Sequence, residues 1–158
     1  MRFTLSVAVC AVVASLPSHA NDLAGRATVI DGDTLEIHGE RIRIEGIDAP
    51  ESRQTCHDRT IAEDVRCGQR AALWLSDLIG ARTVTCQEAG KDRYKRMLAH
   101  CAVAGQDVGA AMVEAGWAMA YVRYSREYEA QEAKARDARL GIWQWDFVAP
   151  WDWRRGAR

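Results

Sequence analysis

Residues 29–51 read VIDGDTLEIHGERIRIEGIDAPE and place three strand signals in close succession. The dipeptide Asp31-Gly32 is typical of a tight hairpin turn between two strands. Further on, apolar and polar residues alternate on either side of a second turn at Gly39-Glu40, as they do in half-buried strands. The segment and its flank therefore predict three sequential strands over residues 24–30, 34–37 and 41–47.

The rest of the chain supplies two more strands and three helices. Alternation predicts the strands, helical spacing of apolar residues predicts the first helix, and Ser125 is a suitable cap for the last one. The expected elements are a helix over 68–79, strands over 82–87 and 97–103, and helices over 108–115 and 125–140. Residues 52–66 are polar and lack periodicity, which predicts a loop. This order favours an α+β fold, a five-stranded Greek-key β-barrel of the oligonucleotide-binding (OB) type with about three packed helices.

The N-terminus predicts export. An apolar run at 5–16 follows Arg2, and Ser18-His19-Ala20 has the small residues of a secretory cleavage site. A permanent anchor needs about 20 apolar residues. We therefore expect residues 1–20 to be a signal peptide and the protein to be periplasmic or secreted, with no membrane attachment after cleavage. Residues 21–158 are expected to form one domain with a Trp-rich tail from about residue 142.

The cysteines agree with an oxidising compartment. Four remain once Cys10 has left with the signal peptide, which predicts two disulfides with three possible pairings. The spacing favours Cys56–Cys67, which closes a polar loop, and Cys86–Cys101, which joins two neighbouring strands. A zinc site is the alternative, but the sequence has no CxxC motif and its histidines are scattered.

The charge is nearly balanced, with 22 acidic and 21 basic residues and a formal net charge of −1. A protein that binds nucleic acid only by covering phosphates with cationic side chains is markedly basic. Any contact with a polyanion must therefore be local or assisted by a metal ion.

Candidate metal ligands lie at the ends of the first strands. Asp33 and Asp48 are hard oxygen donors that suit calcium or magnesium, with the backbone carbonyl of Ala49 and waters completing the set. The alternative is that Asp31 and Asp33 only form the turn, which Asp often does. For Asp31 we favour that alternative, whereas Pro50 already enforces the turn near Asp48.

Three further residues have the chemistry of phosphodiester hydrolysis. Glu51 can orient or deprotonate a water, and Arg43 and Arg96 can donate planar pairs of hydrogen bonds to a phosphate. The composition of 91–96 by itself favours a solvated turn for Arg96.

Tryptophans concentrate in the tail. Such a cluster can stack on bases, but a terminal tryptophan group more often latches over the core, and we favour the latch. Trp143, two residues after the helix-ending Gly141, is expected to be its most buried member. The others are Trp145, Trp151 and Trp153.

Four motifs taken together resemble the staphylococcal nuclease (thermonuclease) family. They are IDGDT at 30–34, RIEGIDAPE at 43–51, DRYKR at 92–96 and LGIW at 140–143. The resemblance implies an OB-type barrel and calcium-dependent hydrolysis of DNA and RNA that leaves 3′-phosphate ends. The substrates are expected to be single-stranded or flexible, and the protein a monomer. The rival hypotheses are a non-catalytic nucleic-acid or protein binding module on the same fold and an exported interaction domain that uses the tryptophan tail.

The resemblance also assigns roles by position. It implies that Asp33, Asp48 and the Ala49 carbonyl bind Ca²⁺, and that Arg43, Glu51 and Arg96 are catalytic. Arg93 and Tyr94 fall where the family contacts a nucleotide phosphate, and Tyr121 where it lines the nucleotide pocket. The chain departs from the family pattern at three relevant positions. Ala49 stands where a threonine is common, but this position contributes its backbone carbonyl, so the ion should still bind. Lys95 replaces the usual glycine before Arg96, and Arg123 stands where a second pocket tyrosine is expected.

Overall fold

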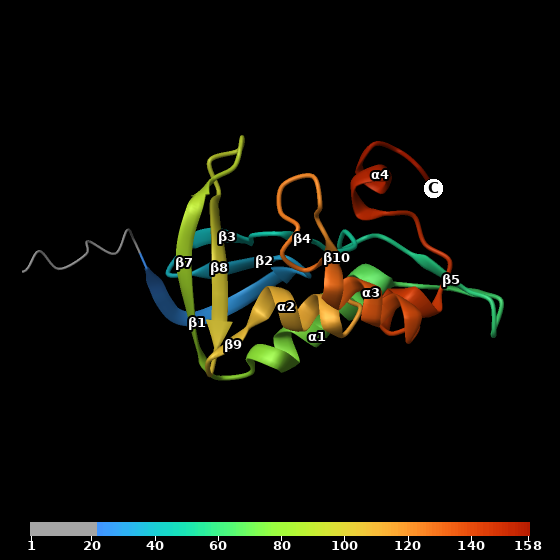
Figure 1. Cartoon of the computed structure of the whole chain (residues 1–158), viewed down its shortest axis with the longest axis horizontal. Coiled ribbons are helices and arrows are strands. Elements are labelled where there is room, and N and C mark those ends of the chain that lie inside the picture. Colours follow the sequence, from blue (N-terminus) through green and yellow to red (C-terminus); the bar gives the residue numbers. More distant parts are fainter. Residues whose placement is uncertain (1–21) are drawn as a thin grey trace, which may run out of the picture.

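Five strands close a β-barrel in the computed structural model, which describes residues 22–158 (Figure 1). The predicted signal peptide, residues 1–20, lies outside the described residues. Neighbouring strands pair antiparallel in the order β3-β2-β1-β7-β8, and a parallel pairing of β3 with β8 closes the barrel. The predicted α+β barrel is confirmed. Its strands are β1 (Leu23–Asp31), β2 (Thr34–Ile37), β3 (Glu40–Ile44), β7 (Thr83–Lys91) and β8 (Met97–Val103), and β9 (Gln106–Asp107) extends the sheet beyond β8.

The third strand is shorter than predicted. Ile42 and Ile44 are buried in the core, and Arg43 between them is partly exposed on the opposite face, as the alternation indicated. However, β3 ends at Ile44, because Gly46 turns the chain with a φ of +77° that residues with a side chain rarely adopt. Beyond it, β4 (Ile47–Asp48) pairs with β10 (Met119–Ala120) and not with the barrel.

The first two helices pack against the barrel, one on β1 and the other on β8, and the later helices lie farther from it (Figure 1). Two of the predicted ranges agree closely with the structure, which places α1 at Cys67–Ile79 and α2 at Val108–Glu114. Three short segments follow, namely α3 (Glu129–Asp137), the 3-10 helix η1 (Gly141–Gln144) and α4 (Pro150–Arg154).

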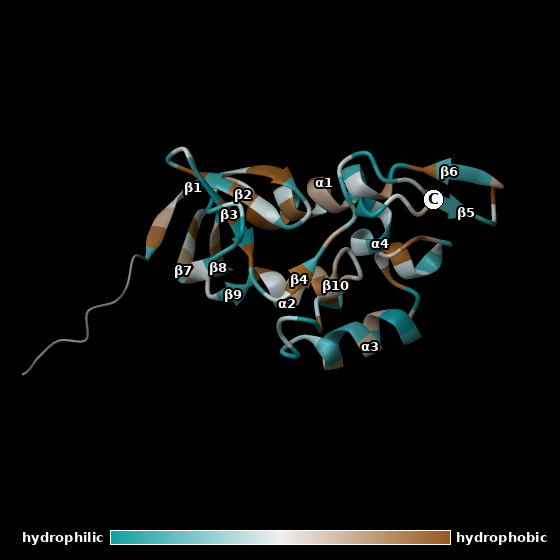
Figure 2. Cartoon of the chain, turned by 90° about the horizontal axis from the view of Figure 1, so that it is seen from above, coloured by the Kyte–Doolittle hydropathy of each residue, from teal (hydrophilic) through white to brown (hydrophobic). Residues whose placement is uncertain are grey.

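The predicted helix over 125–140 is wrong in its extent. Ser125 caps no helix, and its hydroxyl accepts a hydrogen bond from the Glu127 N–H inside a turn. The chain uses this turn to bury Tyr128, whose hydroxyl donates to Asp107, the residue that caps α2. Burial of this tyrosine therefore outweighs the local preference for helix. Figure 2 shows the resulting α3 as a mostly hydrophilic helix at the edge of the molecule.

The predicted loop over 52–66 contains a small hairpin of β5 (Cys56–Asp58) and β6 (Glu63–Val65). Strands of three residues are too short to show alternation in the sequence. A disulfide from Cys56 to Cys67 fastens the hairpin to the start of α1, and a second one joins Cys86 on β7 to Cys101 on β8. Both cysteine pairs agree with the pairing favoured by spacing.

The tail crosses the hairpin as a latch, but its buried residue is not the expected one. Trp145 is 7% exposed, packs beside the Cys56–Cys67 disulfide, and donates its indole N–H to Asp58 over 3.0 Å. Trp143 is only partly buried, because the 3-10 turn at 141–144 points Ile142 inward in its place. Among residues 22–158, no helix has the length and apolar character needed to cross a membrane.

Candidate active site

Most of the predicted site residues line one open pocket of about 650 Å³, whereas the predicted metal ligands Asp33, Asp48 and Ala49 are buried and are not part of its lining. The pocket lies where β3 and β4, the β7–β8 turn, the loop after β10 and α4 meet, and Figure 1 shows the turn, the loop and α4 on the same side of the molecule. Six predicted residues line it, namely Arg43, Glu51, Arg93, Tyr94, Arg96 and Tyr121. Among these six residues the largest separation in the sequence is 78 positions, between Arg43 and Tyr121.

Two buried aspartates and an arginine form the base of the site. The Arg43 guanidinium donates to Asp33 over 3.1 Å and to Asp48 over 2.5 Å, and both aspartates are almost fully buried. Burial raises the pKa of the Asp48 carboxyl, and the neighbouring Asp33 charge adds to the rise. Burial by itself lowers the pKa of Arg43, but the two carboxylates raise it further than burial lowers it. The cluster is therefore held by opposite charges in a poorly solvated position.

Asp31 has a second position-dependent role besides the turn that was predicted for it. Its side chain accepts a hydrogen bond from the Asp33 N–H, as a turn residue does, but it also lines the pocket. Burial raises the pKa of Asp31 to about 6, and the charge of Asp33 adds to the effect. The pocket thus has an additional acidic group beside the two predicted ligands.

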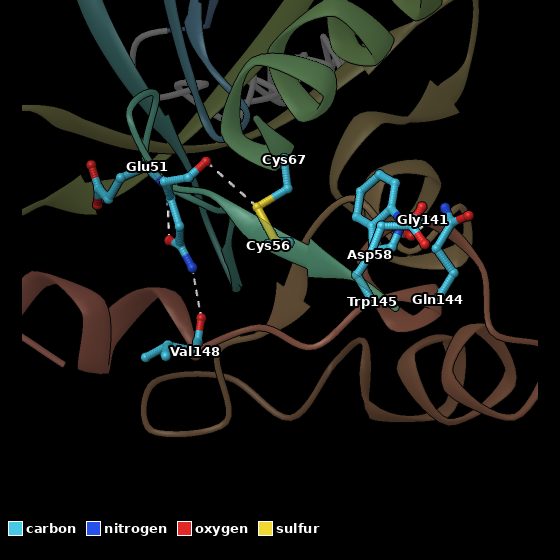
Figure 3. The surroundings of a disulfide bond; sticks show 9 residues. Glu51, Cys56, Asp58, Cys67, Gly141, Gln144, Trp145 and Val148 are labelled. Carbon is cyan, nitrogen blue, oxygen red and sulfur yellow. Dashed lines mark hydrogen bonds between the residues drawn. A yellow bond between two sulfur atoms is a disulfide. The ribbon is translucent and has the colours of Figure 1, made fainter. Parts of the chain in front are cut away.

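Glu51 is fixed by its backbone, which leaves its carboxylate facing the pocket. Its N–H donates to the side-chain oxygen of Gln54 and its carbonyl accepts from the Gln54 N–H. Gln54 is fully buried, and its amide donates to the Val148 carbonyl over 2.6 Å (Figure 3). A Cβ added at Gly68 would lie 1.8 Å from the Glu51 carbonyl oxygen, so the second residue of α1 must be glycine.

Arg154, which was not predicted from the sequence, reaches the site from α4. Its guanidinium donates to both oxygens of Asp48, over 2.9 and 2.7 Å, and to Glu51 over 2.7 Å. Hydrogen bonds and charge from these two carboxylates raise the pKa of Arg154, although burial opposes the shift. No local signal marks this residue, because a single arginine in the polar end of a chain is ordinary surface composition.

The β7–β8 turn orients Arg96. Asp92 accepts hydrogen bonds from the Tyr94 and Arg96 N–H groups and from the Arg96 guanidinium over 2.7 Å. Burial raises the pKa of Asp92, but these hydrogen bonds lower it further, so the net shift is downward. Arg96 is thereby held toward the pocket, and the solvated-turn alternative does not describe it.

Lys95 occupies the left-handed region with a φ of +66°, where a side chain costs roughly 1–2 kcal/mol. We expect Lys95→Gly to raise the free energy of unfolding, by up to about 1 kcal/mol because glycine also gains entropy in the unfolded chain. Urea denaturation measures the change. Lys91→Gly on the adjoining strand is the control and should lower the same free energy. A loss of stability in Lys95→Gly would show that the lysine side chain contributes contacts that outweigh its backbone strain.

Aromatic rings line the opposite wall. Tyr124 meets Tyr121 edge to face at 4.9 Å, and Trp151 of α4 stacks on Tyr121 at 5.7 Å with an interplanar angle of 7°. Tyr124, and not position 123, therefore provides the second pocket tyrosine, while Arg123 lies exposed over the Tyr124 ring. The position of the second tyrosine could not be predicted from the sequence, because the turn after Tyr121 brings Tyr124 back to the pocket.

The oxygen donors of the site suit a hard cation, but the Arg154 guanidinium already occupies those of Asp48. Within residues 22–158, no group of three or more His, Cys, Asp or Glu side chains is arranged to hold a metal ion. The predicted set uses only two carboxylates, Asp33 and Asp48, with a backbone carbonyl and waters, and oxygen donors of this kind suit calcium. Because Arg154 pairs with both oxygens of Asp48, an ion at this position must compete with that guanidinium.

Comparisons with known proteins identify related chains. A family profile described as staphylococcal nuclease homologue matches residues 41–145, more than half of the chain. An uncharacterized endonuclease of Escherichia coli O157:H7 is 34% identical over 149 residues, 89% of this chain and 90% of the relative. A micrococcal nuclease of Shigella flexneri is 32% identical over 169 residues, covering 96% and 91%.

A third relative has a different kind of name. The succinoglycan biosynthesis protein ExoI of Rhizobium meliloti (strain 1021) is 39% identical over 128 residues, 79% of this chain. The match spans 66% of that protein, just under two thirds of its length. The family match at 41–145 includes Arg43, Glu51 and Arg96 and stops before α4 and its Arg154.

Proposed function

The chain belongs to the family of staphylococcal nuclease homologues, and from this premise we propose that it is a calcium-dependent endonuclease that hydrolyses phosphodiester bonds. One observation carries the proposal: Arg43, Glu51 and Arg96 line a single pocket, and Arg43 donates hydrogen bonds to the buried carboxylates of Asp33 and Asp48. The names of the two bacterial nuclease relatives support the same reaction class.

Each residue has a role that its position supports. Asp33, Asp48 and the Ala49 carbonyl hold the ion, which when bound polarises a phosphoryl oxygen and favours ionisation of water. Glu51 accepts the proton of the attacking water, a contribution worth about 10²–10⁴-fold in rate. Arg43 and Arg96 donate hydrogen bonds to the phosphate oxygens as their charge grows in the transition state.

The walls of the pocket favour unpaired nucleotides. Tyr94, Tyr121 and Tyr124 offer ring faces on which bases stack without regard to the sugar. Arg93 and Arg96 flank Tyr94 at 4.9 and 5.7 Å and add charge for the adjacent phosphate. We therefore propose that single-stranded or flexible DNA and RNA are both substrates, and that the products carry 3′-phosphates.

The same proposal includes export. The disulfides Cys56–Cys67 and Cys86–Cys101 persist in oxidising compartments, and residues 1–20 have the composition of a signal peptide. We propose that residues 21–158 act as a monomeric domain in the periplasm or outside the cell.

Removal of the metal ion tests the function. Purified, oxidised protein is incubated with heat-denatured DNA or with RNA, with calcium or with a calcium-selective chelator in excess. We expect cleavage with calcium and its loss with the chelator, restored when calcium is added back. Cleavage that persists in chelator would reject the calcium dependence. Binding of DNA without any cleavage would instead favour the non-catalytic binding module.

A further inference from the structure

The C-terminal helix α4 occupies two parts of the proposed site at once. Arg154 lies at the carboxylates, and Trp151, one helical turn earlier, lies on the ring of Tyr121. We infer that α4 is an internal competitor of cation and nucleotide: Arg154 occupies the carboxylates until calcium displaces it, and Trp151 occupies one face of Tyr121 until a base displaces it. This inference rests on the proposed function and concerns the regulation of the same site.

Arg154 takes the place of positive charge that a divalent cation otherwise supplies. Three carboxyl groups, Asp33, Asp48 and Glu51, face two guanidiniums, those of Arg43 and Arg154. Arg43 is held from the barrel by β3, whereas Arg154 comes from the last helix of the chain. A cation that binds both oxygens of Asp48 must therefore displace Arg154, and it must share Oδ1 of Asp48 with Arg43.

Trp151 takes the place of a stacked base. Its indole lies nearly parallel to Tyr121, which is the arrangement that a nucleobase adopts on an aromatic side chain. The indole has no charge and touches none of the proposed metal ligands through an ion pair or hydrogen bond that the structure records. Its effect on cation binding can therefore arise only through the docking of α4.

The segment between Trp145 and α4 is anchored to the rest of the protein, so α4 can move relative to it. Trp145 stays buried beside the Cys56–Cys67 disulfide, and the Val148 carbonyl is held by Gln54. The five residues of α4 follow directly, and a helix of this length has little stability of its own. Pro150 at the start of α4 is buried, so the residues that can leave the site without disturbing the buried latch are those after 150.

Linkage makes the inference measurable without any nuclease assay. If docking of α4 and binding of calcium exclude each other, every change that weakens docking must strengthen calcium binding, by up to the same factor while the docked form predominates. We expect Trp151→Ala and Arg154→Gln each to bind Ca²⁺ more tightly than the unmodified protein, by about tenfold, within the range typical of coupled sites. Isothermal titration calorimetry with Ca²⁺ alone measures the affinities.

Two controls separate docking from simpler effects. Trp153→Ala removes a ring of the same helix that contacts Arg158 and not the pocket, and Arg155→Gln removes a charge that pairs with Asp152. Both should leave calcium affinity near that of the unmodified protein. Trp151→Ala changes no charge, so tighter binding in this variant cannot come from the loss of electrostatic repulsion.

Limited proteolysis gives a second readout on the unmodified protein. Trypsin cleaves after Arg154 and Arg155 only when these residues extend into the protease, so calcium should accelerate both cuts, as followed by mass spectrometry. Equal calcium affinity in Trp151→Ala and unmodified protein, or no calcium effect on these cuts, would overturn the inference while leaving calcium-dependent cleavage of DNA intact. If no form of the protein binds calcium, the inference fails together with the proposed cofactor.

Discussion

Replacing Glu51 by Gln is expected to lower kcat on single-stranded DNA by about 10²–10⁴-fold, the usual contribution of a general base. The amide keeps the shape of the side chain but cannot accept the proton of the attacking water. Stability should change little, because the Glu51–Arg154 pair is partly exposed and such pairs contribute about 0–1 kcal/mol. Single-turnover kinetics with saturating calcium and thermal denaturation measure the two effects.

Glu63→Gln is the matched control for this experiment, because it makes the same chemical change at an exposed carboxylate on β6. It should leave kcat unchanged. A Glu51→Gln enzyme that retained full kcat would remove Glu51 from the proton transfer and would leave the arginines and the cation as the sources of catalysis.

Loss of the Cys56–Cys67 disulfide is expected to lower the free energy of unfolding by about 2–4 kcal/mol, the typical value for a native disulfide. The bridge fastens the β5–β6 hairpin to α1, and the same peptide segment carries Gln54, which holds the Glu51 backbone. The double substitution Cys56→Ala and Cys67→Ala should therefore also reduce kcat. Urea denaturation and steady-state kinetics measure the two consequences.

The Cys86–Cys101 disulfide offers the comparison for this second prediction. It joins β7 to β8 inside the barrel, away from the Gln54 segment. Its removal should lower stability by a similar amount but affect kcat less. Equal losses of kcat in both double variants would show that activity depends on overall stability and not on how the Cys56 segment holds Glu51.

Local patterns explain why most of the barrel could be predicted. Alternation places Ile42 and Ile44 inward wherever the strand pairs, and Asp31-Gly32 precedes a tight turn in almost any context. The prediction failed where distant contacts outweighed local preference. Tyr128 is buried with its hydroxyl bonded to Asp107, so the helix begins at Glu129 and not at Ser125. Elsewhere, a disulfide stabilises strands of three residues at 56–58 and 63–65.

The candidate site likewise has residues that sequence motifs predicted and residues that only distant contacts bring into place. Motifs along the chain sufficed to name Asp33, Arg43, Asp48, Glu51 and Arg96, because ligands and bases of a given chemistry belong to few residue types. Their assembly around one pocket required the closure of the barrel by β3 and β8, which pair residues over 50 positions apart. Tyr124 entered the pocket only because the turn after Tyr121 folds back.

The sequence by itself determined the barrel, the disulfide pairs and the chemical character of the pocket, because each depends on short-range patterns and on residue types. Only the tertiary structure decided that Arg154 lines that pocket and that Trp151 stacks on Tyr121. Arg154 meets Glu51 across 103 positions, and no periodicity or spacing encodes a contact of that kind. It forms because the buried Trp145 and the Gln54–Val148 hydrogen bond bring the end of the chain to the carboxylates.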